Sequence, residues 1–209
     1  MDKNNITQLG FSEPFLPTTI VENGDDHSVD NLSVVINLSD EEVQINNNEK
    51  LKPFNSSIYK NVKVRRANRI AVVPLTQIQI KEDWQEIQNH IKSSWRTAFD
   101  IFKLPNLRDT QLWRSKKHKL KDLELNYWFA SEGTHCGLHN EHNFKELHTQ
   151  LFGIGHMQKF YDDDPNSLYQ DVHMIPGYTH DFFCDRLCNY PWHQYYAETD
   201  CIWLALEFA

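Results

Sequence analysis

The sequence predicts a mainly β protein, a sandwich or barrel accompanied by one or two packed helices and an N-terminal extension. The chain has 209 residues, of which 40% are hydrophobic, enough for one globular domain with an appendage. From residue 123 onward, short strand-like runs follow one another closely and are separated by turn residues. A stretch with helical periodicity lies before them, at 82–103.

Residues 1–60 are rich in Asn, Asp, Glu and Ser, and they include the run Asn46-Asn47-Asn48. Short apolar runs, such as 33–36, interrupt this polar composition. A segment with few apolar residues buries too little surface to offset the entropy lost when it becomes ordered. We therefore predict an arm at 1–60 that is partly disordered or loosely packed, followed by a domain at 61–209.

The domain is expected to begin with a strand and a helix. Residues 69–80 are strand-like, and the side chains of 75–80 alternate between apolar and polar, the period of a half-buried strand. Apolar residues of 82–103 recur every three or four positions, which predicts one amphipathic helix that packs on a sheet. These residues are Trp84, Ile87, Ile91, Trp95, Ala98, Phe99 and Phe102. Pro105 is expected to end the helix.

Further strands are predicted in the second half of the chain, at 123–130, 146–152, 155–161, 169–174 and 201–208. Turn signals separate them, among them Gly133, Gly137, Gly153 and Pro176-Gly177. Several short strands at close spacing are typical of an all-β sandwich or barrel.

The formal net charge of −8 argues against a protein that binds nucleic acid by neutralising many phosphates. The basic run 115–121 can contact an anionic partner, but a solvated loop is the simpler interpretation. The expected partner is a small-molecule substrate, with a homodimer as a further possibility.

The sequence contains no run of about 18 apolar residues, so no membrane span is expected. The N-terminus lacks the basic and apolar regions of a secretory signal. The four cysteines, Cys136, Cys184, Cys188 and Cys201, are therefore expected to be reduced thiols in a cytoplasmic protein.

Histidine is the unusual residue of this chain, because eight of the 11 histidines lie between His135 and His193. Carboxylates are interleaved with them, and imidazole and carboxylate are ligands for Fe, Mn, Ni, Cu and Zn. In a strand at 146–152, the side chains of Glu146, His148 and Gln150 would share one face. This crowding predicts a metal site rather than a strand edge with ordinary histidines.

The segment 133–153 resembles the first motif of the cupin superfamily. Gly133, His139, Glu146 and Gly153 reproduce the spacing of that motif. Glu141 occupies the usual position of the second histidine, whereas a shifted alignment brings in His142 instead. Neither alternative is excluded by the sequence.

The second cupin motif is similar to the segment that contains Pro176, Gly177 and His180. Gly177 and His180 keep the family spacing, whereas the proline is displaced by one position. Cys184 stands where the family often has Asn. The resemblance covers roughly residues 120–209.

The resemblance implies a double-stranded β-helix, that is, a cupin or jelly-roll barrel, with a mononuclear metal inside. The implied ligands are His139, either Glu141 or His142, Glu146, and His180. The metal is expected to be divalent, Fe(II) first, with Mn, Ni or Zn as possibilities.

Other residues receive roles in catalysis or substrate binding. His148 matches no position of the motif, but its parity with Glu146 places it in the cavity, where His148 and Glu146 are candidates for acid–base catalysis. Candidates for substrate binding are Gln150, Gln158, Tyr178 and His193.

The predicted function is a metal-dependent oxidation of a small molecule by a mononuclear non-haem iron oxygenase or dioxygenase. A cupin isomerase, epimerase or lyase for a sugar or a small acid is the first alternative. A sensor that binds a small molecule or a metal without turnover is the second.

Overall fold

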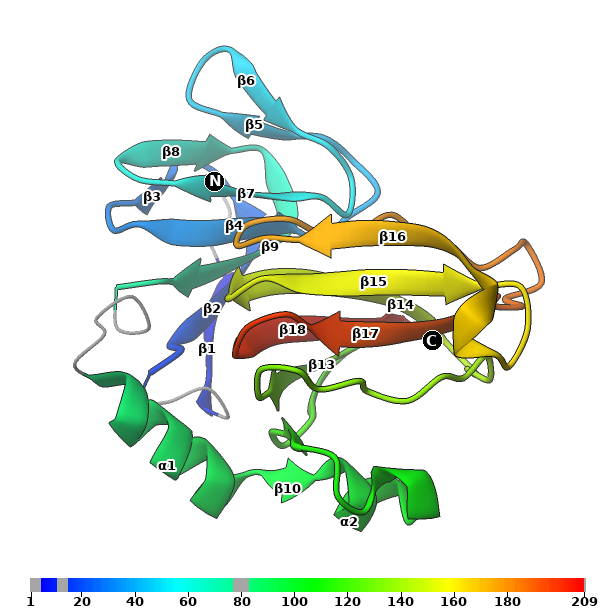
Figure 1. The fold of residues 1–209 in the computed structure, drawn as a ribbon. Helices are drawn as coiled ribbons and strands as arrows, with labels where there is room; N and C mark the ends of the chain where they lie inside the picture. Colours follow the sequence, from blue (N-terminus) through cyan, green and yellow to red (C-terminus); the bar gives the residue numbers. More distant parts are fainter. Residues whose placement is uncertain (1–4, 11–14, 77–82, 209) are drawn as a thin grey trace. The chain divides into compact units, whose positions relative to one another are not determined.

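The computed structural model describes residues 5–10, 15–76 and 83–208. These residues form a mainly antiparallel β structure with two α-helices, as Figure 1 shows. The chain divides into two compact units, Met1–Ile87 with Gly177–Thr179, and Gln88–Pro176 with His180–Ala209. The prediction of a mainly β fold with one or two helices is confirmed.

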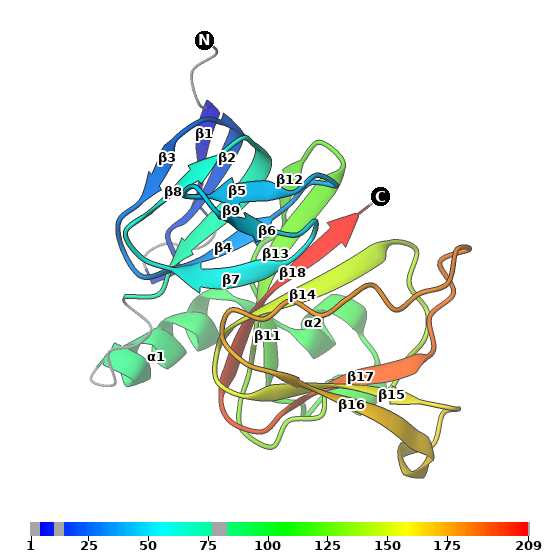
Figure 2. The same ribbon diagram turned by 90° about the horizontal axis from the view of Figure 1, so that it is seen from above.

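The first unit contains nine strands among its described residues. They are β1 Asn5–Leu9, β2 Thr18–Gly24, β3 His27–Val29, β4 Ser33–Asn37, β5 Val43–Ile45, β6 Glu49–Leu51, β7 Ser56–Tyr59, β8 Val62–Arg65 and β9 Ala67–Pro74. One sheet has the order β1-β2-β9-β4-β7 and a second has the order β3-β8-β5-β6 (Figure 2). All the strand pairs are antiparallel.

The expected loose arm at 1–60 is corrected by the structure, because the described strands of this region share a hydrophobic core with Val64, Ala67, Ile70 and Val72. Val21, Val35 and Val64 are completely buried in that core. Some of its Asn residues lie in tight turns, since Asn23 and Asn46 adopt positive φ angles that Asn tolerates better than most residues. A polar composition therefore marked hairpin turns here, and the boundary lies at 87/88 rather than at 60/61.

The helical region departs from one continuous helix. It contains α1 Trp84–Ser94, the two-residue strand β10 Arg96–Thr97 and α2 Ala98–Phe102. Arg96–Thr97 pairs with a neighbouring strand, and the Thr97 side chain accepts a hydrogen bond from the Asp100 amide, which caps α2. Strand β9 covers the first part of the strand predicted at 69–80, and residues 77–80 of that prediction lie outside the described residues.

The remaining elements belong to the second unit. They are the 3-10 helices η3 Pro105–Leu107 and η4 Pro165–Ser167, and the strands β11 Leu112–Arg114, β12 His118–Leu120, β13 Leu123–Ala130, β14 Lys145–Phe152, β15 Gly155–Phe160, β16 Leu168–Met174, β17 Trp192–Ala197 and β18 Cys201–Phe208. The five strands predicted from residue 123 onward correspond to β13, β14, β15, β16 and β18. The sequence reading missed β11, β12 and β17.

Two antiparallel sheets build the second unit. Strands β10-β11-β13-β18-β14 form one, with β12 paired to β13, and β16-β15-β17 form the other. Their inward side chains share one core, in which Trp203 of the first sheet packs with Met157 and Tyr195 of the second. The paired sheets fit the barrel prediction.

The turns between the strands require particular residues. At Gly153, where φ is +75°, a Cβ would lie 1.9 Å from the Asp200 carbonyl oxygen.

The four cysteines are free thiols, with Cys201 buried and the others partly buried. Among the residues that the structure describes, no helix is long and apolar enough to cross a membrane.

Candidate metal centre

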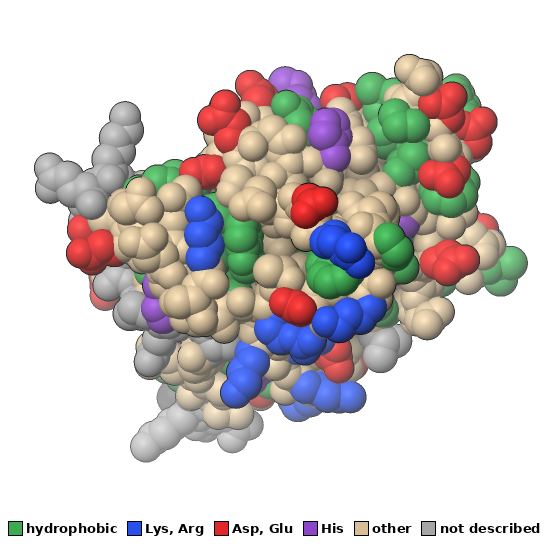
Figure 3. All heavy atoms as spheres, turned by 60° about the horizontal axis from the view of Figure 1, so that its bottom comes forward, with side chains coloured by type: hydrophobic (Ala, Val, Ile, Leu, Met, Phe, Trp, Pro, Cys, Tyr) green, Lys and Arg blue, Asp and Glu red, His purple; other side chains and the backbone are tan. Residues whose placement is uncertain are grey.

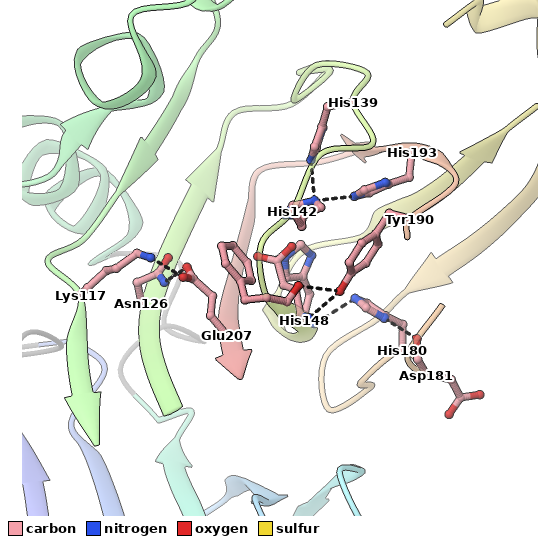
Figure 4. Close-up of polar contacts among 12 residues, drawn as sticks. Lys117, Asn126, His139, His142, His148, His180, Asp181, Tyr190, His193 and Glu207 are labelled. Carbon is pink, nitrogen blue, oxygen red and sulfur yellow. Dashed lines mark hydrogen bonds and ion pairs between the residues drawn. The ribbon is translucent and has the colours of Figure 1, made fainter. Parts of the chain in front are cut away.

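Three histidines of the second unit are brought together by pairing between distant backbone segments. His139 and His193 form an antiparallel bridge in which each backbone amide donates to the carbonyl of the other, at 3.0 and 2.9 Å. Directly opposed residues in such a pair have neighbouring side chains. His142 follows three residues after His139, and its ring approaches the other two (Figure 4).

The Nε2 atoms of these three rings converge. His142 Nε2 lies 3.0 Å from His139 Nε2 and 3.1 Å from His193 Nε2. The Nδ1 atoms of His139 and His193 lie 2.9 Å from the Gly137 carbonyl and 2.8 Å from the Pro191 carbonyl. A carbonyl only accepts, so both Nδ1 atoms carry the proton, and the Nε2 atoms of neutral rings present lone pairs to the centre.

This arrangement fits a metal ion better than it fits a hydrogen-bonded histidine cluster. If the neutral His142 carries its proton on Nε2, it can donate to the Nε2 of only one of its two neighbours. The Nε2 lone pair of the other neighbour then has no donor within the group. Two nitrogen ligands at right angles, each about 2.1 Å from a metal, are about 3.0 Å apart. The backbone carbonyls on Nδ1 orient the rings, as the partners of metal-bound histidines do.

Burial favours the uncharged form of two of these histidines, His142 and His193. Burial lowers the pKa of His142 to about 4, although the Glu146 carboxylate opposes this shift. Burial, reinforced by His139, lowers the pKa of His193 to about 3. Neutral imidazole is the form that binds a metal, so His142 and His193 are in their ligating state at neutral pH.

Glu146 and His148 lie beside the three histidines on strand β14. Glu146 Oε1 is 3.1 Å from His148 Nε2, and both side chains are almost entirely buried. Burial raises the pKa of Glu146, but His148 above all, followed by His142 and His193, outweighs this effect and lowers it to about 2. Glu146 is therefore ionised, and it adds a negative charge next to the three histidine rings.

His180 stands apart from the group formed by His139, His142 and His193. Its Nε2 accepts a hydrogen bond from the His148 backbone amide at 3.0 Å, and its Nδ1 lies 2.9 Å from the Asp181 carbonyl (Figure 4). Both ring nitrogens are thus engaged with backbone groups. His180, one of the implied ligands, therefore uses its ring to hold the backbone of β14.

A cavity of about 370 Å³ adjoins the group. Its lining includes His139, His142 and Glu146, together with Glu141, which is exposed and lies outside the set of converging histidines. Of the two alternatives, Glu141 and His142, only His142 joins His139 in the set of converging histidines. Apolar lining residues are Phe102, Leu104, Leu107, Leu138 and Phe144.

Two cations, Arg114 and Lys117, line the same cavity. Lys117 forms ion pairs with Glu124 and Glu207, which neutralise it. The Nε of Arg114 is buried and has no hydrogen-bond acceptor among the described residues. Figure 3 shows Lys and Arg side chains gathered on part of one face, with acidic and apolar side chains among them, so that face is not uniformly basic.

The remaining predicted substrate-binding residues lie elsewhere, apart from His193. Gln150 is buried and accepts a hydrogen bond from the Tyr195 hydroxyl at 2.6 Å, while its amide donates to the Phe152 carbonyl. Gln158 donates a hydrogen bond to Asp171 and accepts one from Gln194, on the face of β15 that points away from the core. Tyr178 belongs to the short segment that clusters with the first unit.

Tyr190 is a positioning residue that the sequence reading did not identify. Its hydroxyl accepts a hydrogen bond from the Glu146 amide at 2.7 Å and donates one to the Phe144 carbonyl at 3.2 Å. Its ring lies 4.7 Å from that of His142. Tyr190 comes just before β17, whose aromatic residues favour a strand. These aromatic residues were the sequence signal available for this part of the site.

No family model and no curated protein sequence matches the chain. Solved structures resemble about half of it. Ectoine synthase from P. lautus is 14% identical with a TM-score of 0.37, over 47% of this chain and 64% of that protein. A cupin 2 conserved barrel domain protein from Salinispora arenicola is 12% identical with a TM-score of 0.38, over 56% and 83%. KdgF from Halomonas sp. is 14% identical with a TM-score of 0.38, over 55% and 84%. The similar structures are mostly cupin or RmlC-like proteins, the family that the two sequence motifs resemble.

Proposed function

We propose that this protein is a metal-dependent cupin-type enzyme that acts on a small molecule. The observation that carries the proposal is the convergence of the Nε2 atoms of His139, His142 and His193 next to a cavity of about 370 Å³. A cavity of this size suits a metabolite of modest mass. The two cupin-like motifs in the sequence support the same proposal.

The metal would be held by His139, His142 and His193, with the ionised Glu146 carboxylate as the candidate for a fourth ligand. A divalent ion fits this set. The carboxylate would offset one of its two positive charges, the neutral imidazoles would offset none, and the remaining positive charge would favour an anionic ligand. Fe(II) is the first candidate, and Mn, Ni and Zn also bind imidazole and carboxylate. A bound metal of this kind supplies redox or Lewis-acid chemistry.

The first reaction we propose is an O2-dependent oxidation of the substrate, with Fe(II) as the metal. The apolar side chains of Phe102, Leu107 and Phe144 would exclude water from the substrate. The buried Nε of Arg114 favours a substrate that presents an oxygen acceptor, because binding would then satisfy an otherwise unpaired donor.

Proton transfer without oxidation is the second candidate, and the pair Glu146–His148 favours it. His148 Nε2 can hold a proton against Glu146 Oε1 at 3.1 Å, and Tyr190 fixes the backbone of Glu146. An acid–base pair next to a Lewis acid is what an isomerase, epimerase or lyase needs. His148 would then donate or accept the proton of the substrate.

The test begins with elemental analysis of the purified protein, followed by loading with Fe(II) without oxygen. Metal at one equivalent that depends on His139 and His193 supports the proposal, and His90→Ala on α1 serves as the matched control. Protein that binds no metal at these residues overturns it.

Turnover then distinguishes the reactions. A panel of small organic acids and sugars is screened for O2 uptake by the Fe(II)-loaded protein and, separately, for conversion without oxygen. O2 uptake that His139→Ala abolishes supports the oxygenase, whereas conversion without oxygen supports the isomerase or lyase. Tight binding of a panel compound without turnover supports the sensor and contradicts both enzymes.

A further inference from the structure

A second group of histidines and carboxylates occupies the outward face of the sheet β16-β15-β17, whose strands lie side by side in Figure 1. Met157 and Met174 belong to the core of the second unit, so the residues next to them in each strand point away from that core. His156 of β15 lies opposite His173 of β16. Two residues further along, Gln158 lies opposite Asp171, on the same face.

Two carboxylates contact the His156 ring. Nδ1 lies 2.7 Å from Asp171 Oδ1, and Nε2 lies 2.9 Å from Glu198 Oε2. The ring centroids of His156 and His173 lie 4.4 Å apart, with the two rings edge to face. One ligand atom from each of His156, Asp171 and His173 lies within 4.8 Å of the others. These three side chains can therefore reach one ion with small movements.

The surroundings already orient two of the three side chains. Glu198 accepts the Nε2 proton of His156, which turns the Nδ1 atom toward Asp171, the arrangement in which a carboxylate holds a metal-bound histidine. The Gln158 amide donates to Asp171 Oδ2 at 2.9 Å, so Oδ1 stays on the side of His156. Gln194 in turn donates to the Gln158 carbonyl at 2.9 Å. Such outer contacts are unnecessary for an isolated surface ion pair.

We propose that His156 Nδ1, Asp171 Oδ1 and a ring nitrogen of His173 form a second binding site for a divalent transition metal ion, separate from the converging histidines. Two imidazoles and one carboxylate suit Zn²⁺, Ni²⁺ or Cu²⁺, whereas Mg²⁺ and Ca²⁺ prefer oxygen ligands. Asp171 and His173 are exposed, so the ion reaches the site from solvent. Bound there, it would join β15 to β16 through their side chains.

Metal-free protein satisfies the same group in another way. Burial lowers the pKa of His156, but the hydrogen bonds that its ring donates to Glu198 and Asp171 outweigh this effect, and the pKa is raised. A protonated ring donates from each of its nitrogens to one of the two carboxylates. An entering ion replaces the Nδ1 proton, and Glu198 retains its hydrogen bond.

Equilibrium dialysis of the full chain against Zn²⁺ alone, at micromolar free metal, tests the site. We expect the wild type to bind two equivalents and Asp171→Asn/His173→Ala to bind one. The double variant keeps its fold because both side chains are exposed, which circular dichroism verifies. His90→Ala, the surface control, is expected to keep two equivalents. A second equivalent that survives Asp171→Asn/His173→Ala overturns the site.

The His139→Ala variant isolates this site from the converging histidines. Loaded with one equivalent of Co²⁺, it should show a visible ligand-field spectrum that the further changes Asp171→Asn and His173→Ala abolish. A spectrum that persists after these changes contradicts the proposal, as does wild-type protein whose only equivalent depends on His139. Failure of the centre around His139 would instead leave one equivalent that depends on His173, so the two proposals fail separately.

Discussion

The two histidine groups of the second unit use the same side chain in opposite electrostatic settings. In the group of His139, His142 and His193, backbone carbonyls hold the rings and burial lowers the pKa of two of them. In the outer group, carboxylates on both sides raise the pKa of His156. His193 and Gln194 are neighbours on β17, yet strand alternation sends them to opposite faces. The side of the sheet, rather than the residue type, therefore sets the direction in which the pKa of a histidine shifts here.

Acid should destabilise the metal-free protein more than any single change below. The pKa values of His180 and His193 are lowered from 6.5 to about 3 in the folded protein. Below pH 6.5 the unfolded chain therefore binds more protons than the folded protein does. Stability present above pH 6.5 is lost as the pH falls, by about 2 kcal/mol for each group at pH 5. Thermal unfolding with a chelator, between pH 7 and pH 4.5, measures this.

The outer group should respond in the opposite direction. The raised pKa of His156 contributes stability that is complete below pH 6.5 and is lost as the pH rises through its folded value. His156→Asn should remove this loss on the alkaline side and leave the acid side unchanged. Equal effects on both sides would mean that the two groups do not differ as described.

Gly153→Ala should lower the free energy of unfolding by about 3 kcal/mol or more, because the turn between β14 and β15 holds the frame of both groups. Its Cβ would meet the Asp200 carbonyl oxygen at 1.9 Å, and its φ is +75°. Gly133→Ala is the matched control, since φ is +77° with nothing within 4 Å. We expect it to cost only about 1 kcal/mol by urea unfolding. Similar losses for the two variants would remove the packing argument.

His193→Ala should weaken metal binding at the converging histidines by at least about 100-fold, because it removes a ligand. His180→Ala should weaken it by about 10-fold, since His180 supports the β14 backbone through its ring nitrogens. Competition with a chromogenic chelator measures both affinities. The reverse order would make His180 the ligand and His193 the support.

Glu198→Gln should have the smallest effect, weakening the outer site by about 10-fold without altering the inner one. Gln can still accept the Nε2 proton of His156, but it lacks the charge that strengthens this hydrogen bond. Zn²⁺ titration of the His139→Ala background measures the change. An unchanged affinity would show that Glu198 does not support the ligand.

The sequence alone located most of the strands and the region of the site. Strand β13 spans the predicted 123–130, and β14, β15, β16 and β18 lie within a residue of their predictions at each end. Their apolar alternation is a local property that survives in any tertiary context. The spacing in 133–153 likewise singled out His139, His142 and Glu146, which line one cavity.

Other features depended on contacts between distant residues. The first unit buries a core although its sequence is polar, because a few apolar side chains gather from many short strands. The helix at 82–103 is interrupted because Arg96–Thr97 finds a strand partner. The local sequence pattern of either segment does not show which distant residues it will contact.

Which histidines lie together was decided by tertiary structure alone. His180 and His193 both lie far along the chain from His139, and spacing favoured His180. The backbone pairing of His139 with His193 brings His193 to the centre, while His180 turns its nitrogens to the backbone around β14. Residue type and strand parity are written in the sequence, but which strands become neighbours is settled only when long-range hydrogen bonds and the shared core form together.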